Sequence, residues 1–360
     1  MKKQILRLLP FLFALLLMSG CAAAADAPSA PETTEVFMET VPVVTASAEE
    51  TLPETERFWL TFVGDCTLGT HPGNYNADVG FVKLVGEDYR YPFANVLSLF
   101  EEDECSFANL EGPLCDDGTS VVKKHTFRGP REFVRILTEN SVEAVSLANN
   151  HTMDYGTRGY LETKETLESA AIPYVERDAS RIFTTKNGLT VGLYGAVYDR
   201  LDREEILSGI RELAEQGLDL VIFAPHWGYE GSFVSNRDQI ALGRAAIEAG
   251  ADIVWGSHPH VLQPVETWEK GIIFYSLGNF VFGGNGKPGD FDTAVIRQEI
   301  LRHPDGTVTL GETVLLPACV SSESRWNNFQ PVLCEAGTDS YDRILAKLSG
   351  TWKEACIKIG

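Results

Sequence analysis

The chain is poor in cysteine and in basic residues, and it has no long apolar segment. Its seven cysteines include no C-x-x-C pair, so a zinc site built from thiolates is not expected. Lysine and arginine total 30 against 51 aspartates and glutamates, which gives a formal net charge of −21. Because nucleic acid and acidic lipid headgroups attract basic faces, this balance argues against both as partners.

The apolar run near the start of the chain is too short to be a comfortable membrane span. It covers Leu8–Met18, whereas a spanning helix needs about 20 apolar residues. Basic residues precede it and the letters MSGC end it, a pattern typical of a secretory signal. MSGC resembles a bacterial lipobox, so we expect residues 1–21 to be a lipoprotein signal peptide with lipid on Cys21. The alternative is an ordinary signal cut nearby, with Cys21 incidental.

Basic residues are also missing from residues 22–56, which carry eight acidic residues and several prolines and threonines. Such a segment cannot bury enough apolar surface to order itself, so it is predicted to be a disordered acidic tether. With a lipid anchor it would hold the protein outside the cytoplasm, on the bacterial cell membrane. The alternative is a dispensable leader.

Apolar, β-rich runs alternate with helical patterns from residue 57 onward, which predicts an α/β protein. The run RFWLTFVGD is typical of a buried strand, and NRDQIALGRAAIEAG of a helix closed by Gly250. TAVIRQEILRH and TVTLGETVLLP alternate like antiparallel strands. We expect one domain over residues 57–335 and a C-terminal helical extension over residues 336–360.

Six cysteines remain if Cys21 carries lipid. An even set in an exported protein permits disulfides in fifteen connectivities. Cys319 with Cys334 is the favoured pair.

Polar side chains follow several of the predicted strands, at the end where open α/β sheets bind ligands. The candidate metal ligands are Asp65, Glu111, Asn150, His226, His258 and His260. Imidazoles mixed with carboxylates suit Mn, Fe or Zn better than Ca or Mg. A carboxylate can bridge two ions, and two ions about 3.5–4 Å apart can clamp a phosphoryl group and activate a hydroxide. The simpler interpretation of the histidine pair is a polar turn leaving a sheet.

His151 and Asp154 lie beside these ligands in the sequence NNHTMD. A histidine oriented by a carboxylate is a natural general acid for a leaving oxygen, so both are candidate catalytic residues. Without its neighbours, His151 would be interpreted equally well as a capping or core residue.

The sequence KKHTFRGP is the densest basic cluster of the acidic domain. Its Lys124, His125 and Arg128 are candidate substrate-binding residues, because Arg128 can hold a carboxylate or phosphate through two hydrogen bonds. The alternative is a solvated loop. Trp227 and Glu230, next to a candidate ligand in HWGYE, are expected to form a pocket wall.

Six motifs occur in the order FVGDCTLG, NLEGPL, LANNHTMDYG, PHWGYE, GSHPHVLQP and YSLGNFVF. Over about Phe58–Phe282 they resemble the signature of the CapA family of poly-γ-glutamate capsule synthesis proteins, relatives of the calcineurin-like metallophosphoesterases. The resemblance implies a four-layer α/β/β/α sandwich with a metal centre at its crest. It also implies the metal-ligand and acid roles assigned above.

Two departures from the phosphoesterase pattern affect the metal centre. Thr67 stands where those enzymes have a histidine, and their bridging aspartate has no literal match, so we assign its role to Glu111. The resemblance therefore implies one divalent ion, or two of which the second binds weakly.

The predicted function is a surface-tethered, metal-dependent hydrolase, phosphoesterase-like, in biosynthesis of a poly-γ-glutamate capsule or another envelope polymer. Its substrate would be an anionic polymer or a phosphoester, and its partners would be capsule synthetase membrane proteins and, through the lipid, the membrane. The alternative is a non-catalytic factor that binds or anchors the polymer and retains a structural metal.

Overall fold

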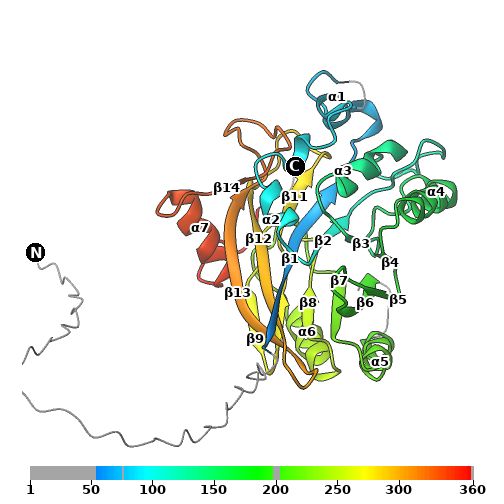
Figure 1. The fold of residues 1–360 in the computed structure, drawn as a ribbon. Coiled ribbons are helices and arrows are strands. Elements are labelled where there is room, and N and C mark those ends of the chain that lie inside the picture. Colours follow the sequence, from blue (N-terminus) through cyan, green and yellow to red (C-terminus); the bar gives the residue numbers. More distant parts are fainter. Residues whose placement is uncertain (1–53, 75–76, 198–202, 358–360) are drawn as a thin grey trace, which may run out of the picture. The chain divides into compact units, whose positions relative to one another are not determined.

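Two β-sheets lie face to face in the computed structural model, which describes residues 54–74, 77–197 and 203–357 (Figure 1). The signal peptide and almost all of the tether predicted above lie outside these residues. In the first sheet the strand order is β14 (Val332–Leu333), β13 (Val308–Cys319), β12 (Asp292–Arg302), β1 (Glu56–Thr67), β2 (Cys105–Leu110), β3 (Ala144–Ser146) and β4 (Tyr174–Val175), and β11 (Asn279–Phe282) also pairs with β1. In the second it is β5 (Ala179–Thr184), β6 (Thr190–Val197), β7 (Leu220–His226), β8 (Ile253–Trp255), β10 (Gly271–Phe274) and β9 (Val265–Trp268).

Both sheets have a parallel centre, which brings the carboxyl ends of successive strands to one edge. Strands β1 to β4 pair in parallel, as do β6, β7, β8 and β10. The pairing of β12 with β13 is antiparallel, which confirms the strands predicted from TAVIRQEILRH and TVTLGETVLLP. β12 in turn lies antiparallel to β1.

Apolar side chains fill the space between the sheets and also cover their outer faces. Between the sheets, Phe62 stacks on Phe107 with ring centroids 4.8 Å apart, and Trp255 packs against both rings. The first sheet is covered by α1 (Phe81–Val85), α2 (Leu97–Glu101), α3 (Val134–Thr138) and α4 (Gly156–Ser169). The second is covered by α5 (Arg203–Ala214) and α6 (Arg237–Glu248). The four-layer α/β/β/α fold is thus confirmed.

Helix ends follow local sequence signals. The side chain of Asn236 accepts hydrogen bonds from the first turn of α6, and the Gln239 side chain accepts one from the Asn236 amide, which is a capping box. Gly250, the predicted stop, has a φ of 113° and lies two residues beyond the end of that helix. Single-turn 3-10 helices cover Pro72–Asn74, Tyr91–Phe93 and Arg131–Phe133. Among the described residues, no helix is long and apolar enough to cross a membrane.

The C-terminal region packs onto the first sheet and then crosses to the loop after β7. Helix α7 (Asp339–Leu348) buries Ile344 and Leu348 in the core between the sheets. Beyond it, the Phe233 amide donates to the Ala355 carbonyl at 2.9 Å, and the Ile357 amide donates to the Gly231 carbonyl at 2.8 Å. The last described residues thus form a backbone bridge to residues 231–233, which we call the C-terminal strap.

Two cysteines of the first sheet lie side by side. The Sγ atoms of Cys319 and Cys334 are 3.6 Å apart, and both residues are thiols in this structure. The structure therefore brings together the pair favoured from the sequence, and their oxidation stays a prediction.

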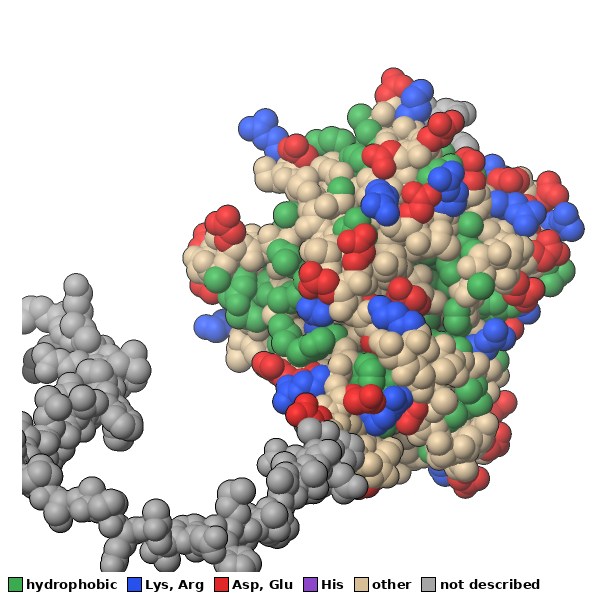
Figure 2. Space-filling model, viewed as in Figure 1, with side chains coloured by type: hydrophobic (Ala, Val, Ile, Leu, Met, Phe, Trp, Pro, Cys, Tyr) green, Lys and Arg blue, Asp and Glu red, His purple; other side chains and the backbone are tan. Residues whose placement is uncertain are grey.

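On the face shown in Figure 2, basic and acidic side chains are interspersed over the described residues. A mixed face of this kind is a poor match for the phosphate backbone of nucleic acid.

Candidate metal centre

The candidate ligands come from the carboxyl ends of strands in both sheets. Asp65 lies near the end of β1, Glu111 directly follows β2, and His226 is the last residue of β7. Asn150 follows β3, and the loop after β8 carries His258 and His260. The parallel pairing of these strands is what collects six residues from distant parts of the chain.

A glycine allows β1 to approach the loop before β11 closely enough to hold Asp65. A Cβ on Gly64 would lie 1.9 Å from the Gly278 carbonyl oxygen, so no other residue fits there without a shift. The Asp65 amide donates to that same carbonyl at 2.8 Å. The Asp65 side chain is held as well, because Asn109 Nδ2 donates to Asp65 Oδ1 at 2.8 Å. Asp65 Oδ2 is left to face the other candidate ligands.

Two ligand groups share Glu111. Asp65, Glu111 and His260, which we call the Asp65 group, are all buried and offer donor atoms within 4.8 Å of one another. His226, Asn150, His258 and Glu111 form a second set, which we call the His226 group. In it, His226 Nε2 lies 3.0 Å from Asn150 Oδ1 and 3.7 Å from Glu111 Oε1, and the centroids of the His226 and His258 rings are 4.6 Å apart. Glu111 Oε2 instead faces His260, at 3.8 Å from Nδ1. One carboxylate thus points an oxygen at each group.

Several of these atoms are buried without a hydrogen bond. They are both carboxylate oxygens of Glu111, Asp65 Oδ2 and His258 Nδ1. Leaving a buried polar atom unsatisfied costs about 1–3 kcal/mol, and more for a charged group. Divalent cations bound at the two groups would satisfy these atoms, so the residues present fit the metal centre that the sequence resemblance implies.

Burial and mutual contact shift the pKa values of this cluster strongly. Burial raises the pKa of Glu111 to about 8 and lowers that of His258 to about 4. Burial also lowers the pKa of His226 well below its usual value. For His260 burial acts in the same direction, but Glu111 and Asp65 outweigh it and raise the pKa to about 10. Neutral imidazoles are the form that binds metal, and His226 and His258 are held in it.

The backbone at the paired histidines is strained and held from several sides. His258 has a φ of 100° and His260 a φ of 58°, values that residues with a side chain rarely adopt. His260 Nδ1 lies 2.9 Å from Asn279 Oδ1, and the Asn279 amide group donates to the His260 carbonyl at 3.4 Å. His226 Nδ1 lies 2.9 Å from Ser257 Oγ. Such contacts fix the orientation of ligand rings.

His151 is held by Asp154 beside the Asp65 group. His151 Nδ1 lies 2.7 Å from Asp154 Oδ2, which also accepts a hydrogen bond from the Phe127 amide at 2.7 Å. Lys123 Nζ lies 2.6 Å from Asp154 Oδ1 and donates to the Asn150 carbonyl at 3.0 Å. Sequence reasoning did not single out Lys123. Its place in KKHTFRGP was visible, but no periodicity indicates which lysine of that cluster turns inward.

A cavity of about 290 Å³ opens beside the Asp65 group. Its walls include the predicted residues His151, His260, Lys124, His125 and Glu230. Phe127 and Phe282 add apolar surface. The cavity therefore combines cationic, apolar and acidic walls next to the candidate ligands.

Two predicted pocket residues, Arg128 and Trp227, do not line this cavity. Arg128 is not among the residues that line this cavity; its Nη1 donates to the Asp116 carbonyl at 3.2 Å and its guanidinium lies over the Tyr155 ring. Trp227 is buried in the core beneath α6, where Nε1 donates to the Tyr275 carbonyl at 2.9 Å. It borders a second cavity of about 270 Å³, beside His226 and His258.

Known proteins match this chain over the region that holds the site. The family described as "Bacterial capsule synthesis protein PGA_cap" matches residues 59–284. The capsule biosynthesis protein CapA of Bacillus anthracis is 31% identical over 257 residues, which are 64% of this chain and 61% of that relative. The PGA biosynthesis protein CapA of Bacillus subtilis (strain 168) is 29% identical over 270 residues, 68% of each chain.

Solved structures show a partial likeness. A Haemophilus influenzae NAD nucleotidase has a TM-score of 0.42 at 12% identity, covering 82% of this chain and 63% of that chain. A purple acid phosphatase from yellow lupin seeds has a TM-score of 0.32 at 12% identity, covering 72% and 54%. Likenesses of this extent carry no conclusion about activity.

Proposed function

Since the chain belongs to the bacterial capsule synthesis protein family, we propose that it is a metal-dependent hydrolase in poly-γ-glutamate capsule biosynthesis. The bond cleaved would be a phosphoester, or an amide of an anionic polymer. The observation that carries this proposal is the buried carboxylate of Glu111, whose two oxygens lack hydrogen bonds and face His226 and His260 separately. A residue placed in this way is suited to bridge two cations.

The metal would be held by the Asp65 group, by the His226 group, or by both. When bound, a divalent cation polarises the scissile group and lowers the pKa of coordinated water. The chain's own contribution is to orient the ligands, to exclude water from their buried side, and to supply a proton donor. Mn, Fe or Zn fits this donor set of carboxylate, amide oxygen and imidazole.

His151 would supply the proton. Because Nδ1 faces the Asp154 carboxylate, Nε2 is the ring atom left to donate to a leaving oxygen. Burial lowers the pKa of His151, so its protonated form depends on the Asp154 contact. Lys123 and the Phe127 amide hold Asp154 in place, which makes them positioning groups rather than reactants.

Lys124 and His125 lie in the cavity wall and would attract an anionic substrate. Arg128 lies outside that wall, so we assign it no contact with substrate.

A polymer-binding factor with a structural metal is the second candidate. It is favoured by the names of the relatives, which speak of biosynthesis and not of cleavage. In that case His151 and Asp154 would be ordinary buried polar residues, and no substrate would turn over with any metal.

We further propose that Cys21 carries lipid and that residues 22–56 tether the enzyme to the outer face of the membrane. Capsule synthetase membrane proteins would then be its neighbours. The support is the signal-like sequence and the family; the described residues do not test it.

The test combines metal analysis with a substrate screen. The purified chain is stripped with chelator, reloaded with Mn²⁺, Fe²⁺ or Zn²⁺, and assayed with phosphomonoesters, phosphodiesters and γ-glutamyl oligomers. Turnover that needs metal and is lost in His226→Ala supports the hydrolase. Metal binding without turnover of any substrate supports the binding factor, and absence of metal binding contradicts both.

A further inference from the structure

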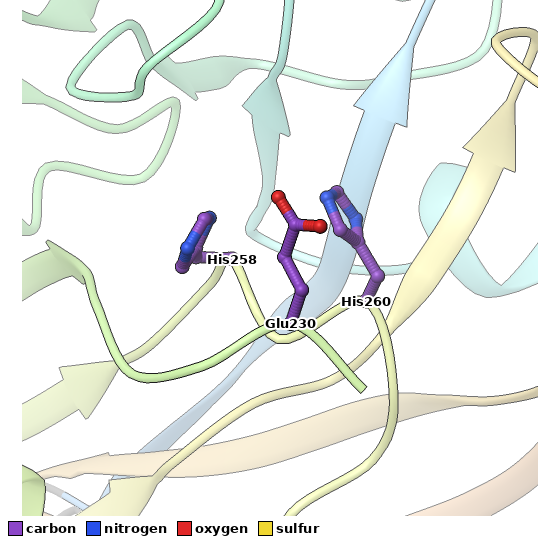
Figure 3. A group of neighbouring side chains, drawn as sticks. All are labelled: Glu230, His258 and His260. Atoms are coloured by element: carbon purple, nitrogen blue, oxygen red, sulfur yellow. The ribbon is translucent and has the colours of Figure 1, made fainter. Parts of the chain in front are cut away.

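We propose that Glu230 is a metal ligand that closes the solvent side of the centre; this rests on the proposed metal centre. The sequence places this residue in the pocket wall, but the structure places it among donors. Glu230, His258 and His260 each offer a ligand atom, and these atoms lie within 4.8 Å of one another. Figure 3 shows the Glu230 carboxylate between the two imidazoles.

The position of Glu230 joins the two ligand groups from outside. His260 belongs to the Asp65 group and His258 to the His226 group, so a carboxylate next to both rings can reach an ion in either. Glu111 lies on the buried side of the same two groups. The centre would thus have the Glu111 carboxylate on its buried side and the Glu230 carboxylate on its solvent side.

Charge and coordination number both favour a further donor. The Asp65 group offers one ligand atom from each of three residues, whereas Mn, Fe and Zn take four or more ligands. Asp65 and Glu111 supply only two negative charges against the charge of two divalent ions. Thr67, buried beside them, adds a neutral hydroxyl and no charge. A third carboxylate, that of Glu230, would reduce the excess of positive charge that remains.

Glu230 is held in place by its backbone, unlike an ordinary surface carboxylate. The next residue, Gly231, donates its amide to the carbonyl of Pro259, which stands between the two histidines, at 2.8 Å. The C-terminal strap pairs with the other side of the same loop, through Phe233 and Gly231. The side chain itself is exposed, and among the described residues its carboxylate has no hydrogen bond or ion pair. The fixed backbone keeps the carboxylate near the two imidazoles, and its oxygens have no competing partner among the described residues.

The alternative is that Glu230 only borders the cavity and acts on substrate by charge. The two roles differ in what a neutral isostere does to metal binding. If Glu230 is a ligand, Glu230→Gln should weaken binding of the ion. If Glu230 only borders the cavity, the same substitution should leave the affinity for the ion unchanged.

The experiment measures metal binding by the purified full chain. Zn²⁺ and Mn²⁺ affinities and stoichiometries are determined by equilibrium dialysis with elemental analysis, and Co²⁺ loading is followed by visible absorption. Tyr229→Phe, on the same loop and exposed, is the matched control. His226→Ala is the reference for loss of a buried ligand.

Glu230→Gln is expected to lower the affinity for at least one ion by about tenfold or more and to change the Co²⁺ spectrum, with Tyr229→Phe equal to wild type. Equal affinity and an unchanged spectrum in Glu230→Gln, with binding lost in His226→Ala, would overturn the assignment of Glu230 alone. If the wild-type chain binds no ion, the proposed centre itself fails. Circular dichroism of each variant confirms that the fold is retained.

Discussion

Replacing Lys347 with methionine should destabilise the protein more than any surface lysine substitution. Its side chain is 2% exposed, and Nζ lies 2.7 Å from Asp290 Oδ2 and 2.7 Å from Asp292 Oδ2. Asp292 keeps its two contacts with Arg343, at 2.6 and 2.7 Å, when the lysine is removed. Asp290 loses its cation while remaining 11% exposed, so the variant contains a nearly buried carboxylate without an ionic partner.

The expected cost is that of breaking a buried ion pair, about 3–5 kcal/mol. In a protein of this size that corresponds to a fall in Tm of about 10 °C. The cost should shrink as the pH falls, because protonation of Asp290 removes the unpaired charge. Burial first, and then Asp292, already raises the pKa of Asp290, so this relief should begin above the usual aspartate range.

The assay is thermal unfolding of protein freed of metal with a chelator. Unfolding is monitored by circular dichroism at several pH values. Lys353→Met, at an exposed position beyond α7, is the control. The double variant Lys347→Met with Asp290→Asn should recover most of the loss. If Lys347→Met melts within a degree or two of Lys353→Met, the ion pair does not stabilise the fold and the reasoning is refuted.

Four further predictions concern the site, the anchor and the fold. His226→Ala should lower bound Mn, Fe or Zn with the fold retained; equal metal content in variant and wild type would count against the ligand assignment. His151→Ala should reduce any turnover by roughly 10²–10⁴ with little loss of metal, because a positioned acid is worth about that much, and Asp154→Asn should act in the same direction less severely; unchanged kcat in both would exclude the proposed proton donor. Cys21→Ala should remove the lipid and release the protein from the membrane fraction of the bacteria. A wild-type mature protein that carries no lipid and begins at another residue would contradict this. Burial raises the pKa of Asp103 from 3.8 to about 6. The folded state therefore favours the protonated form, and its stabilisation is complete below about pH 4 and lost as the pH rises through about 6. The free energy of unfolding of wild type should fall by at most about 3 kcal/mol over that range relative to Asp103→Asn; parallel pH profiles of the two proteins would contradict this.

The candidate ligand residues were recognisable in the sequence because they follow apolar runs. A strand rich in β-branched and aromatic residues is recognisable in one sequence, and the polar residue after it lies at the edge where parallel strands end. Asp65, Asn150 and His226 were found in this way. The same reasoning predicted the antiparallel pair of β12 and β13, which are eleven and twelve residues long.

The loops were not predictable, because their contacts depend on turns without a periodic pattern. Lys123 turns toward Asp154, while Arg128 of the same basic cluster stacks on Tyr155. Both carry positive charge, and charge alone does not say which one faces the cavity. Glu230 does line the cavity, as predicted, but its closeness to His258 and His260 could not be predicted, because it depends on how the loop after β7 meets the loop after β8.

Strand β1 lies in the middle of the first sheet, yet two of the strands that pair with it, β11 and β12, are synthesised much later in the chain. Arg57 of β1 pairs with Leu301 of β12, and Asp65 of β1 pairs with Asn279 of β11; Figure 1 labels the three strands. The strap reaches residues 231–233 only from residues 355–357. In a chain growing from its N-terminus, one side of this strand therefore stays unpaired until β11 and β12 have been synthesised. Asp65 lies on this strand, so we expect the candidate metal centre to be complete only after β11 and β12 have paired with it. A product truncated before β11 would contain every candidate ligand and still lack the strands that hold Asp65 in place, so we expect it to bind the ion poorly.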